Sequence, residues 1–200
     1  MNKSIKMDTK NIIESVKIRA AVRSDMPDVY KMIQELAIFE EMPDGPKIKA
    51  DTLERDAFDS SPPLFKCYMA EVTDKNNVTE SVGYALFFNT YSTWEGKSLM
   101  LEDIFVKPNY RKMGVGKKMF QAIAKYALDT ECCRVDFHVL KWNPARTMYE
   151  LIGATNLTES EDWLFYRLGK DALGNLYKGA LLCEDSMPKG VGEKCKTKSL

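Results

Sequence analysis

The chain has few of the residues that build several common kinds of site. It contains a single histidine, His138, so a zinc site made from several histidines is excluded and a histidine-activated nucleophile would depend on this one side chain. Its five cysteines show no C-x-x-C spacing and two of them are adjacent, which indicates reduced thiols and not a disulfide framework. We therefore expect no metal site and a cytoplasmic protein.

A net charge and a long apolar run are also absent. Twenty-nine Lys and Arg balance twenty-nine Asp and Glu, so no global basic field would recruit nucleic acid. The longest apolar stretch, residues 85–88, is strand-sized and far below the roughly 20 residues that cross a bilayer. The first residues are charged and lack the apolar core of a signal peptide. We expect neither nucleic acid nor a membrane as a partner.

What is present is the composition of a folded globular protein, with 44% hydrophobic and 29% charged residues. Residues 17–170 carry periodic hydrophobic segments and are expected to form one domain. Residues 1–16 are polar and aperiodic, and residues 171–200 form an extension with several lysines toward its end. We expect the N-terminal segment and the end of the C-terminal extension to be mobile.

The hydrophobic periodicity predicts an α/β fold of the order β-α-α-β-β-β-α-β-α-β, with a mixed, mostly antiparallel central sheet flanked by helices. Short turns join the three middle strands, which favours an antiparallel meander, and a strand-helix-strand crossover follows. Strands are predicted near residues 17–22, 67–72, 82–88, 98–106, 134–140 and 163–168. Helices are predicted after a cap at Ser24 or Asp25, from near Asp51, over residues 116–130 and around residues 145–151.

The most informative segment, residues 111–116, stands between a predicted strand and the longest predicted helix, and it reads R-x-x-G-x-G. Its glycines allow close backbone approach, and the unpaired N–H groups in a helix's first turn bind anions, so it would hold a diphosphate. A P-loop is excluded because Lys117 is followed by Lys118 and because only one residue separates the glycines. A dinucleotide fingerprint is excluded because Met119 stands where a third small residue is needed.

This segment resembles the pyrophosphate-binding loop of the GCN5-related N-acetyltransferase (GNAT) superfamily, and the resemblance extends from about residue 17 to residue 168. Five blocks look like those of the spermidine/spermine (diamine) N-acetyltransferases, at residues 35–40, 91–97, 101–106, 142–143 and 161–163. The resemblance implies the GNAT fold, a homodimer, and transfer of acetyl from acetyl-CoA to a primary amine of a small diamine or polyamine.

The resemblance also implies the residues of the site. Glu102 would take a proton from the amine through water, and Tyr149 would protonate the departing thiolate. The implied acetyl-CoA contacts are Ile104, Phe105, Val106, Arg111, Lys112, Met113, Gly114, Val115, Gly116, Lys117 and Asn143. The implied amine contacts are Phe39, Glu40, Ser92, Trp94, Glu102, Asp103, Glu161 and Trp163.

The chemistry is consistent with the residues themselves. A primary amine with a pKa of about 10.4 is protonated at pH 7, so a carboxylate such as Glu102 has to accept its proton before it can attack the thioester. A phenol can protonate the leaving thiolate, and backbone donors can meet the charge that develops on the carbonyl oxygen. Direct transfer needs no metal and no protein nucleophile, which suits a chain with one histidine.

Three departures from the family pattern bear on specificity and cofactor contacts. Phe39 stands where the diamine enzymes have a tyrosine, Ser92 where they have an aspartate, and Asn143 is one residue closer to Tyr149 than usual. Fewer carboxylates favour a shorter or less charged amine, such as agmatine, putrescine or thialysine, over spermine. Two alternatives stay open: an acetyltransferase for another small amine, and a non-catalytic acetyl-CoA-binding interaction protein.

Overall fold

A computed structural model describes residues 13–161 and 163–185, and the chain divides into two compact units with the boundary between Asn143 and Pro144. Most of the expected N-terminal segment and the end of the C-terminal extension lie outside these residues. Residues 13–16, expected to be aperiodic, belong to the first strand. Within the described part of the chain, no helix has both the length and the apolar character needed to span a membrane.

The first unit is built on one five-stranded sheet with the strand order β1-β2-β3-β4-β5. Strands β1 to β4 pair antiparallel, and β5 pairs parallel to β4 after a helical crossover through α3 (Val115–Asp129). The strands are β1 (Ile13–Ala20), β2 (Lys66–Asp74), β3 (Thr79–Ser92), β4 (Gly96–Val106) and β5 (Val135–Phe137). The predicted meander and crossover are confirmed, although β5 is shorter than predicted and ends before His138.

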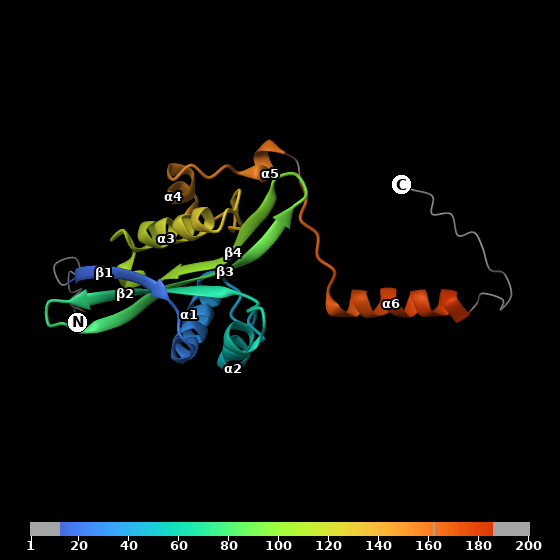
Figure 1. The fold of residues 1–200 in the computed structure, drawn as a ribbon, viewed down its shortest axis with the longest axis horizontal. Coiled ribbons are helices and arrows are strands. Elements are labelled where there is room, and N and C mark those ends of the chain that lie inside the picture. The colour runs from blue at the N-terminus through green and yellow to red at the C-terminus, as the bar shows by residue number, and fades with distance from the viewer. Residues whose placement is uncertain (1–12, 162, 186–200) are drawn as a thin grey trace, which may run out of the picture. The chain divides into compact units, whose positions relative to one another are not determined.

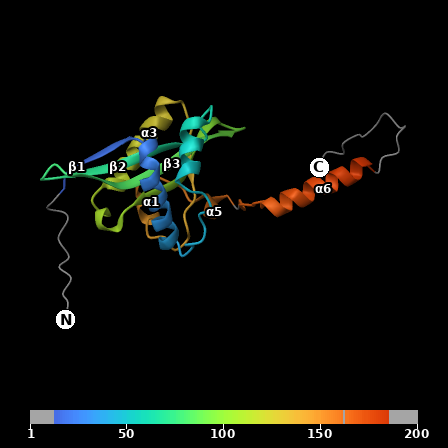
Figure 2. The same cartoon turned by 90° about the horizontal axis from the view of Figure 1, so that it is seen from below.

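Helices cover both faces of this sheet, with α1 and α2 on one face and α3 on the other (Figures 1 and 2). The helix α1 spans Met26–Phe39, and α2 spans Ala50–Glu54 and continues as the π-helical turn Arg55–Asp59. Each face buries its own cluster of large apolar side chains, each of which contributes roughly 1.5–3 kcal/mol. Met26, Val29, Met32, Tyr84 and Phe105 belong to the cluster on the α1 face, and Phe87, Leu101, Met119 and Ile123 to the cluster on the α3 face.

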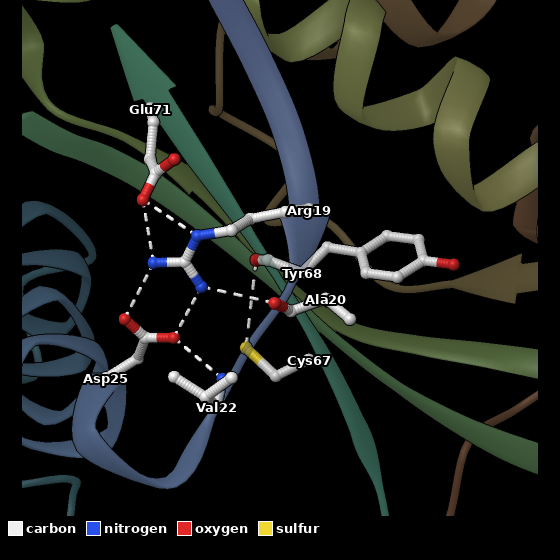
Figure 3. Close-up of polar contacts among 7 residues, drawn as sticks. All are labelled: Arg19, Ala20, Val22, Asp25, Cys67, Tyr68 and Glu71. Carbon is white, nitrogen blue, oxygen red and sulfur yellow. Dashed lines mark hydrogen bonds and ion pairs between the residues drawn. The ribbon is translucent and has the colours of Figure 1, made fainter. Parts of the chain in front are cut away.

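An ion-pair cluster joins β1, β2 and the start of α1 (Figure 3). The Arg19 guanidinium donates to both carboxylate oxygens of Asp25 at 2.6 and 2.9 Å and to Glu71 at 2.7 Å. Asp25 also accepts the N–H of Val22 at 2.7 Å. The hydrogen bond from Arg19, followed by that from Val22, lowers the pKa of Asp25 despite its burial. A side-chain cap of α1 by Asp25 was a wrong prediction, because Arg19 and Val22 engage its oxygens instead.

The second unit contains α4 (Arg146–Leu151), α5 (Leu157–Ser160) and α6 (Lys170–Asp185). The strand predicted at residues 163–168 is wrong, because these residues form neither strand nor helix and their large apolar side chains are exposed. An apolar segment becomes a strand only where another edge accepts its backbone hydrogen bonds, and no strand of the described residues does so here.

Candidate active site

A β-bulge in β4 shapes the site. Leu86 of β3 lies opposite Asp103, whereas the next residue, Phe87, lies opposite Leu101, so Glu102 is an extra residue in β4. The bulge reverses the alternation of faces along the strand. Leu101 belongs to the core under α3, but Asp103 hydrogen-bonds to Tyr84 in the core under α1. Glu102 itself is exposed.

Beyond the bulge, the edge of β4 on the β5 side has no strand partner among the described residues. The strand β5 pairs only with residues 99–101 of β4, and residues 103–106 pair with β3 alone. A free strand edge offers N–H and C=O groups to an extended ligand. Ile104, Phe105 and Val106, three of the expected acetyl-CoA contacts, lie along this free edge.

The loop after β4 has the backbone form that an anion site needs. Gly114 caps α3 in the left-handed conformation with φ of 81°, and Lys112 has φ of 62°. The N–H groups of Val115, Gly116 and Lys117 lie in the first turn of α3, where a helix offers them no acceptor of its own. The sequence motif and the start of a long helix therefore coincide.

Glu80 of β3 anchors this loop. Its carboxylate accepts hydrogen bonds from Lys107 Nζ at 2.9 Å and from Tyr110 Oη at 2.7 Å. These two bonds, that of Lys107 first, lower the pKa of Glu80, and the bond to Glu80 raises the pKa of Tyr110 to about 12. Tyr110 ends the 3-10 turn Pro108–Tyr110, so the path of the chain is held just before the motif begins.

Arg111, the first residue of the motif, turns back toward α1. Its guanidinium carbon lies 4.8 Å from the ring centre of Phe39 and 5.5 Å from that of Phe105, and its Nε donates to the carbonyl oxygen of Val106 at 2.8 Å. Burial lowers the pKa of Arg111, which remains protonated at all ordinary pH values. Arg111 thus contacts both the free edge of β4 and an expected amine contact at the end of α1.

Two expected amine-binding carboxylates lie near each other on the α1 face. The pKa of Asp103 is raised above its usual value, mainly by burial. The hydrogen bond from Tyr84 opposes this rise, and the charge of Glu102 adds to it. Burial and the nearby charge of Asp103 raise the pKa of Glu40, which follows the last residue of α1. In the described part of the chain, no Lys or Arg forms an ion pair with Asp103 or Glu40.

The other expected amine contacts of the first unit, Ser92 and Trp94, lie at the opposite end of β4. Ser92 is the last residue of β3 and Trp94 lies in the turn that follows. At about 3.3 Å per residue, the start of β4 at Gly96 is roughly 20 Å along the strand from Glu102. Ser92 Oγ accepts the N–H groups of Trp94 and Glu95 at 3.2 and 3.3 Å, and Arg134 donates to it at 3.3 Å. The Trp94 side chain is 85% exposed. Within the first unit, Ser92 and Trp94 therefore lie far from Asp103 and Glu40.

The remaining expected residues lie at the boundary or in the second unit. Asn143 ends the first unit, and Tyr149 is a buried residue of α4. Glu161 directly follows α5, and the Trp163 side chain is 66% exposed. The roles of these four residues stay predictions. The described residues contain no group of three or more His, Cys, Asp or Glu side chains arranged as metal ligands would be.

Two further residues near the site have no role in the sequence-based prediction. Tyr84 falls within the strand predicted at residues 82–88, where a hydroxyl in an apolar run is a signal of a buried hydrogen bond. Trp142 belongs to the block at residues 142–143, and its ring centre lies 5.5 Å from that of Phe39. Neither contact follows from spacing along the chain, because both join elements that are distant in sequence.

The chain is similar to known acetyltransferases over most of its length. Residues 29–154 match the sequence pattern of the acetyltransferase (GNAT) family. The chain is 40% identical over 166 residues to thialysine N-epsilon-acetyltransferase of Mus musculus, a match that covers 81% of this chain and 97% of that protein. It is 36% identical over 159 residues to spermidine/spermine N(1)-acetyltransferase-like protein 1 of Homo sapiens, covering 78% of this chain and 23% of that protein.

The fold is similar to the solved structure of an integron cassette protein from V. cholerae. The TM-score is 0.64 at 22% identity, and the match covers 82% of this chain and 98% of that one. The free edge of β4, the glycine loop before α3 and these similarities agree with one another. The chain therefore belongs to the acetyltransferase (GNAT) family, in the group with relatives named as thialysine and spermidine/spermine acetyltransferase-like proteins.

Proposed function

We propose that this protein transfers acetyl from acetyl-CoA to a primary amine of a small cationic substrate. The observation that carries the proposal is the position of Asp103 and Glu40, two partly buried carboxylates near each other, with Asp103 on the strand that has the free edge. Within the described residues no cation pairs with them, and a charged carboxylate in such a place favours a cationic ligand. Family membership supports acetyl transfer as the reaction.

A thialysine-like amine is the proposed acceptor, and a diamine or polyamine is the second candidate. Relatives that match nearly their full length carry thialysine in their names. Phe39 and Ser92 also make this chain less polar than the diamine enzymes that it resembles, which is consistent with an acceptor of lower charge. The similarity to a relative named as spermidine/spermine N(1)-acetyltransferase-like supports a longer amine as the second candidate.

The residues fit acetyl-CoA in two places, and when bound it supplies the activated thioester. Backbone groups of Ile104, Phe105 and Val106 would pair with its pantetheine arm. The other proposed contacts, from Arg111 to Lys117, would surround the diphosphate with backbone N–H groups and with the charges of Arg111, Lys112 and Lys117. Asn143 is proposed from the resemblance alone.

Each catalytic group then has a separate task. Asp103 and Glu40 bind the ammonium form of the substrate, and Glu102 accepts its proton through water, which leaves a free amine that can attack. Backbone donors of β4 stabilise the negative charge on the carbonyl oxygen. Tyr149 gives its proton to the departing thiolate.

A homodimer is part of the proposal. Ser92 and Trp94 lie at the β3–β4 turn, too far from the bulge of β4 to join Asp103 and Glu40 within the first unit, so a second copy would have to supply them to a shared amine site. The exposed apolar residues of segment 163–168 also offer surface that a second copy can cover.

A thiol-release assay with a panel of amines tests the proposed function. We expect turnover with thialysine at the highest kcat/KM, with lower values for lysine, putrescine, agmatine and spermidine. Asp103→Asn should raise KM for every cationic amine and leave the Kd for acetyl-CoA unchanged. Asp28→Asn is a matched control, because Asp28 is exposed near the other end of α1. Binding of acetyl-CoA without turnover of any amine would reject the proposal and favour the non-catalytic alternative.

A further inference from the structure

The phenol of Tyr84 contacts the proposed amine site from inside the core. Tyr84 lies on β3 with a side chain that is 0% exposed, and its Oη donates to Asp103 Oδ2 at 2.9 Å. The ring packs in the apolar cluster on the α1 face together with Phe105, which lies opposite Tyr84 in the sheet. The bond therefore runs from the buried interior to a carboxylate near the free edge of β4.

A phenylalanine ring would pack in the same place, so packing alone does not require the hydroxyl of Tyr84. A buried hydroxyl costs about 1–3 kcal/mol unless it is hydrogen-bonded, and Asp103 is the partner that it has among the described residues. A hydrogen bond to an ionised carboxylate is also stronger than one between neutral groups. The bond fixes one oxygen of Asp103 and so defines where the charge of this carboxylate lies.

Three other titratable groups lie around Asp103. The charge of the adjacent Glu102 raises the pKa of Asp103, and the charge of Asp103 in turn raises the pKa of Glu40 at the end of α1. The third group, the buried thiol of Cys67 on β2, has a pKa raised to about 12, so it adds no charge at ordinary pH. No ion pair from the described part of the chain offsets these groups at Asp103. The hydrogen bond from Tyr84 is the one contact that lowers the pKa of Asp103, against burial and the charge of Glu102.

We propose that Tyr84 is a positioning residue for the amine site, whose phenol holds one carboxylate oxygen of Asp103 in place and so orients this carboxylate toward a cationic substrate. This inference rests on the proposed function, in which Asp103 binds the ammonium group. Tyr84 itself touches neither substrate, since its side chain is buried beneath the sheet surface.

Tyr84→Phe tests the inference, because it removes the hydroxyl and keeps the ring. KM for the best amine should rise about 5- to 20-fold, because Asp103 is no longer held in the orientation that binds the ammonium group. The kcat should change less than about threefold, because the groups that act in the transfer step are unchanged. The acid limb of the kcat/KM profile should move to higher pH, because loss of the donor raises the pKa of Asp103. The Kd for acetyl-CoA should stay unchanged.

Tyr68→Phe is the matched control. Tyr68 lies on the neighbouring strand β2, and its ring points away from the polar cluster of Figure 3. No hydrogen bond of its hydroxyl is found in the described residues, so this variant should keep the wild-type KM and pH profile. Equal KM increases in Tyr84→Phe and Tyr68→Phe would overturn the inference, because a general loosening of the sheet would explain both.

A measurement without turnover separates this inference from the proposed function. The Asp103 carboxyl carbon, identified by the loss of its signal in Asp103→Asn, is titrated by carbon-13 NMR in the wild type and in Tyr84→Phe. We expect a higher midpoint in Tyr84→Phe, and equal midpoints would overturn the role of Tyr84 even if amines are acetylated. If Tyr84→Phe does not fold, Asp103→Asn decides instead: persistence of the wild-type acid limb in that variant would overturn the inference.

Discussion

The guanidinium of Arg111 lies over the ring of Phe39, with 4.8 Å between the guanidinium carbon and the ring centre. The same side chain donates to the carbonyl oxygen of Val106. One cation thereby joins the end of α1 to the end of β4, the elements that carry the proposed amine and acetyl-CoA contacts. A change at Arg111 is expected to affect both the stability of the first unit and the binding of acetyl-CoA.

Arg111→Lys should lower the free energy of unfolding by about 1–2 kcal/mol, because an ammonium group cannot stack on Phe39 and donate to Val106 in the same geometry. Urea unfolding measures this change, and calorimetry should show a weaker Kd for acetyl-CoA. Lys117→Gln, at an exposed position of α3, should change stability by less than about 0.5 kcal/mol. Equal stability of wild type and Arg111→Lys would contradict the structural role of the contact.

Gly83→Ala should destabilise the protein by at least about 2 kcal/mol. A Cβ atom at Gly83 would lie 2.5 Å from the carbonyl oxygen of Phe105 and 3.5 Å from Met119 Sδ, so β4 or α3 has to move. Acetyl-CoA binding should weaken with it, because the displaced segment carries the free edge. Gly174→Ala in α6 is the matched substitution, with no atom within 4 Å, and it should be neutral or stabilising by up to about 1 kcal/mol.

Asp25→Asn should reduce the unfolding free energy at pH 7 by about 1–3 kcal/mol, since it removes a partly buried partner of Arg19. The pKa of Asp25 is lowered in the folded state, so its contribution is complete above the unfolded value of about 3.9 and is lost as the pH falls through the folded value. The difference between variant and wild type should therefore shrink between pH 5 and pH 2 in urea unfolding. Asp28→Asn, in an exposed pair with Lys31, should cost less than about 0.5 kcal/mol at either pH.

Ser92→Asp alone should leave the order of preferred amines unchanged. Arg134 already donates to Ser92 Oγ at 3.3 Å, so it is placed to pair with a new carboxylate at this position and to hold it away from an amine. Ser92→Asp combined with Arg134→Gln should raise kcat/KM for spermidine relative to thialysine, beyond the effect of Arg134→Gln alone. The same order of amines in all three variants would remove this turn from the determinants of specificity.

Tyr149→Phe should lower kcat by roughly 10²–10⁴-fold if the phenol protonates the leaving thiolate. Glu102→Gln should instead raise the pH needed for activity, because free amine would then come only from solution. Steady-state kinetics from pH 6 to pH 10 distinguish the two effects. A loss below about threefold in Tyr149→Phe, or an unchanged pH profile in Glu102→Gln, would remove the respective residue from the mechanism.

Local patterns were sufficient for the parts of the fold that depend on neighbours in sequence. The apolar spacing predicted α1 and α3, and short turns predicted the pairing of β2, β3 and β4. The strand predicted at residues 163–168 is wrong because an apolar composition is equally compatible with a strand and with an exposed segment. Only a neighbouring strand edge that can pair with the segment decides between the two.

The glycine loop before a long helix, the carboxylates at 102 and 103, and the family can be predicted from the amino-acid sequence, because these are properties of consecutive residues. The effect of the bulge at Glu102 follows only from how β4 pairs with β3 in the fold. A regular strand would place Asp103 on the same face as Leu101, whereas the extra residue turns Asp103 to the α1 face, near Glu40 and within reach of Tyr84. Register between strands is a long-range property, and here it decides that Asp103 is partly buried and that Glu102 is exposed.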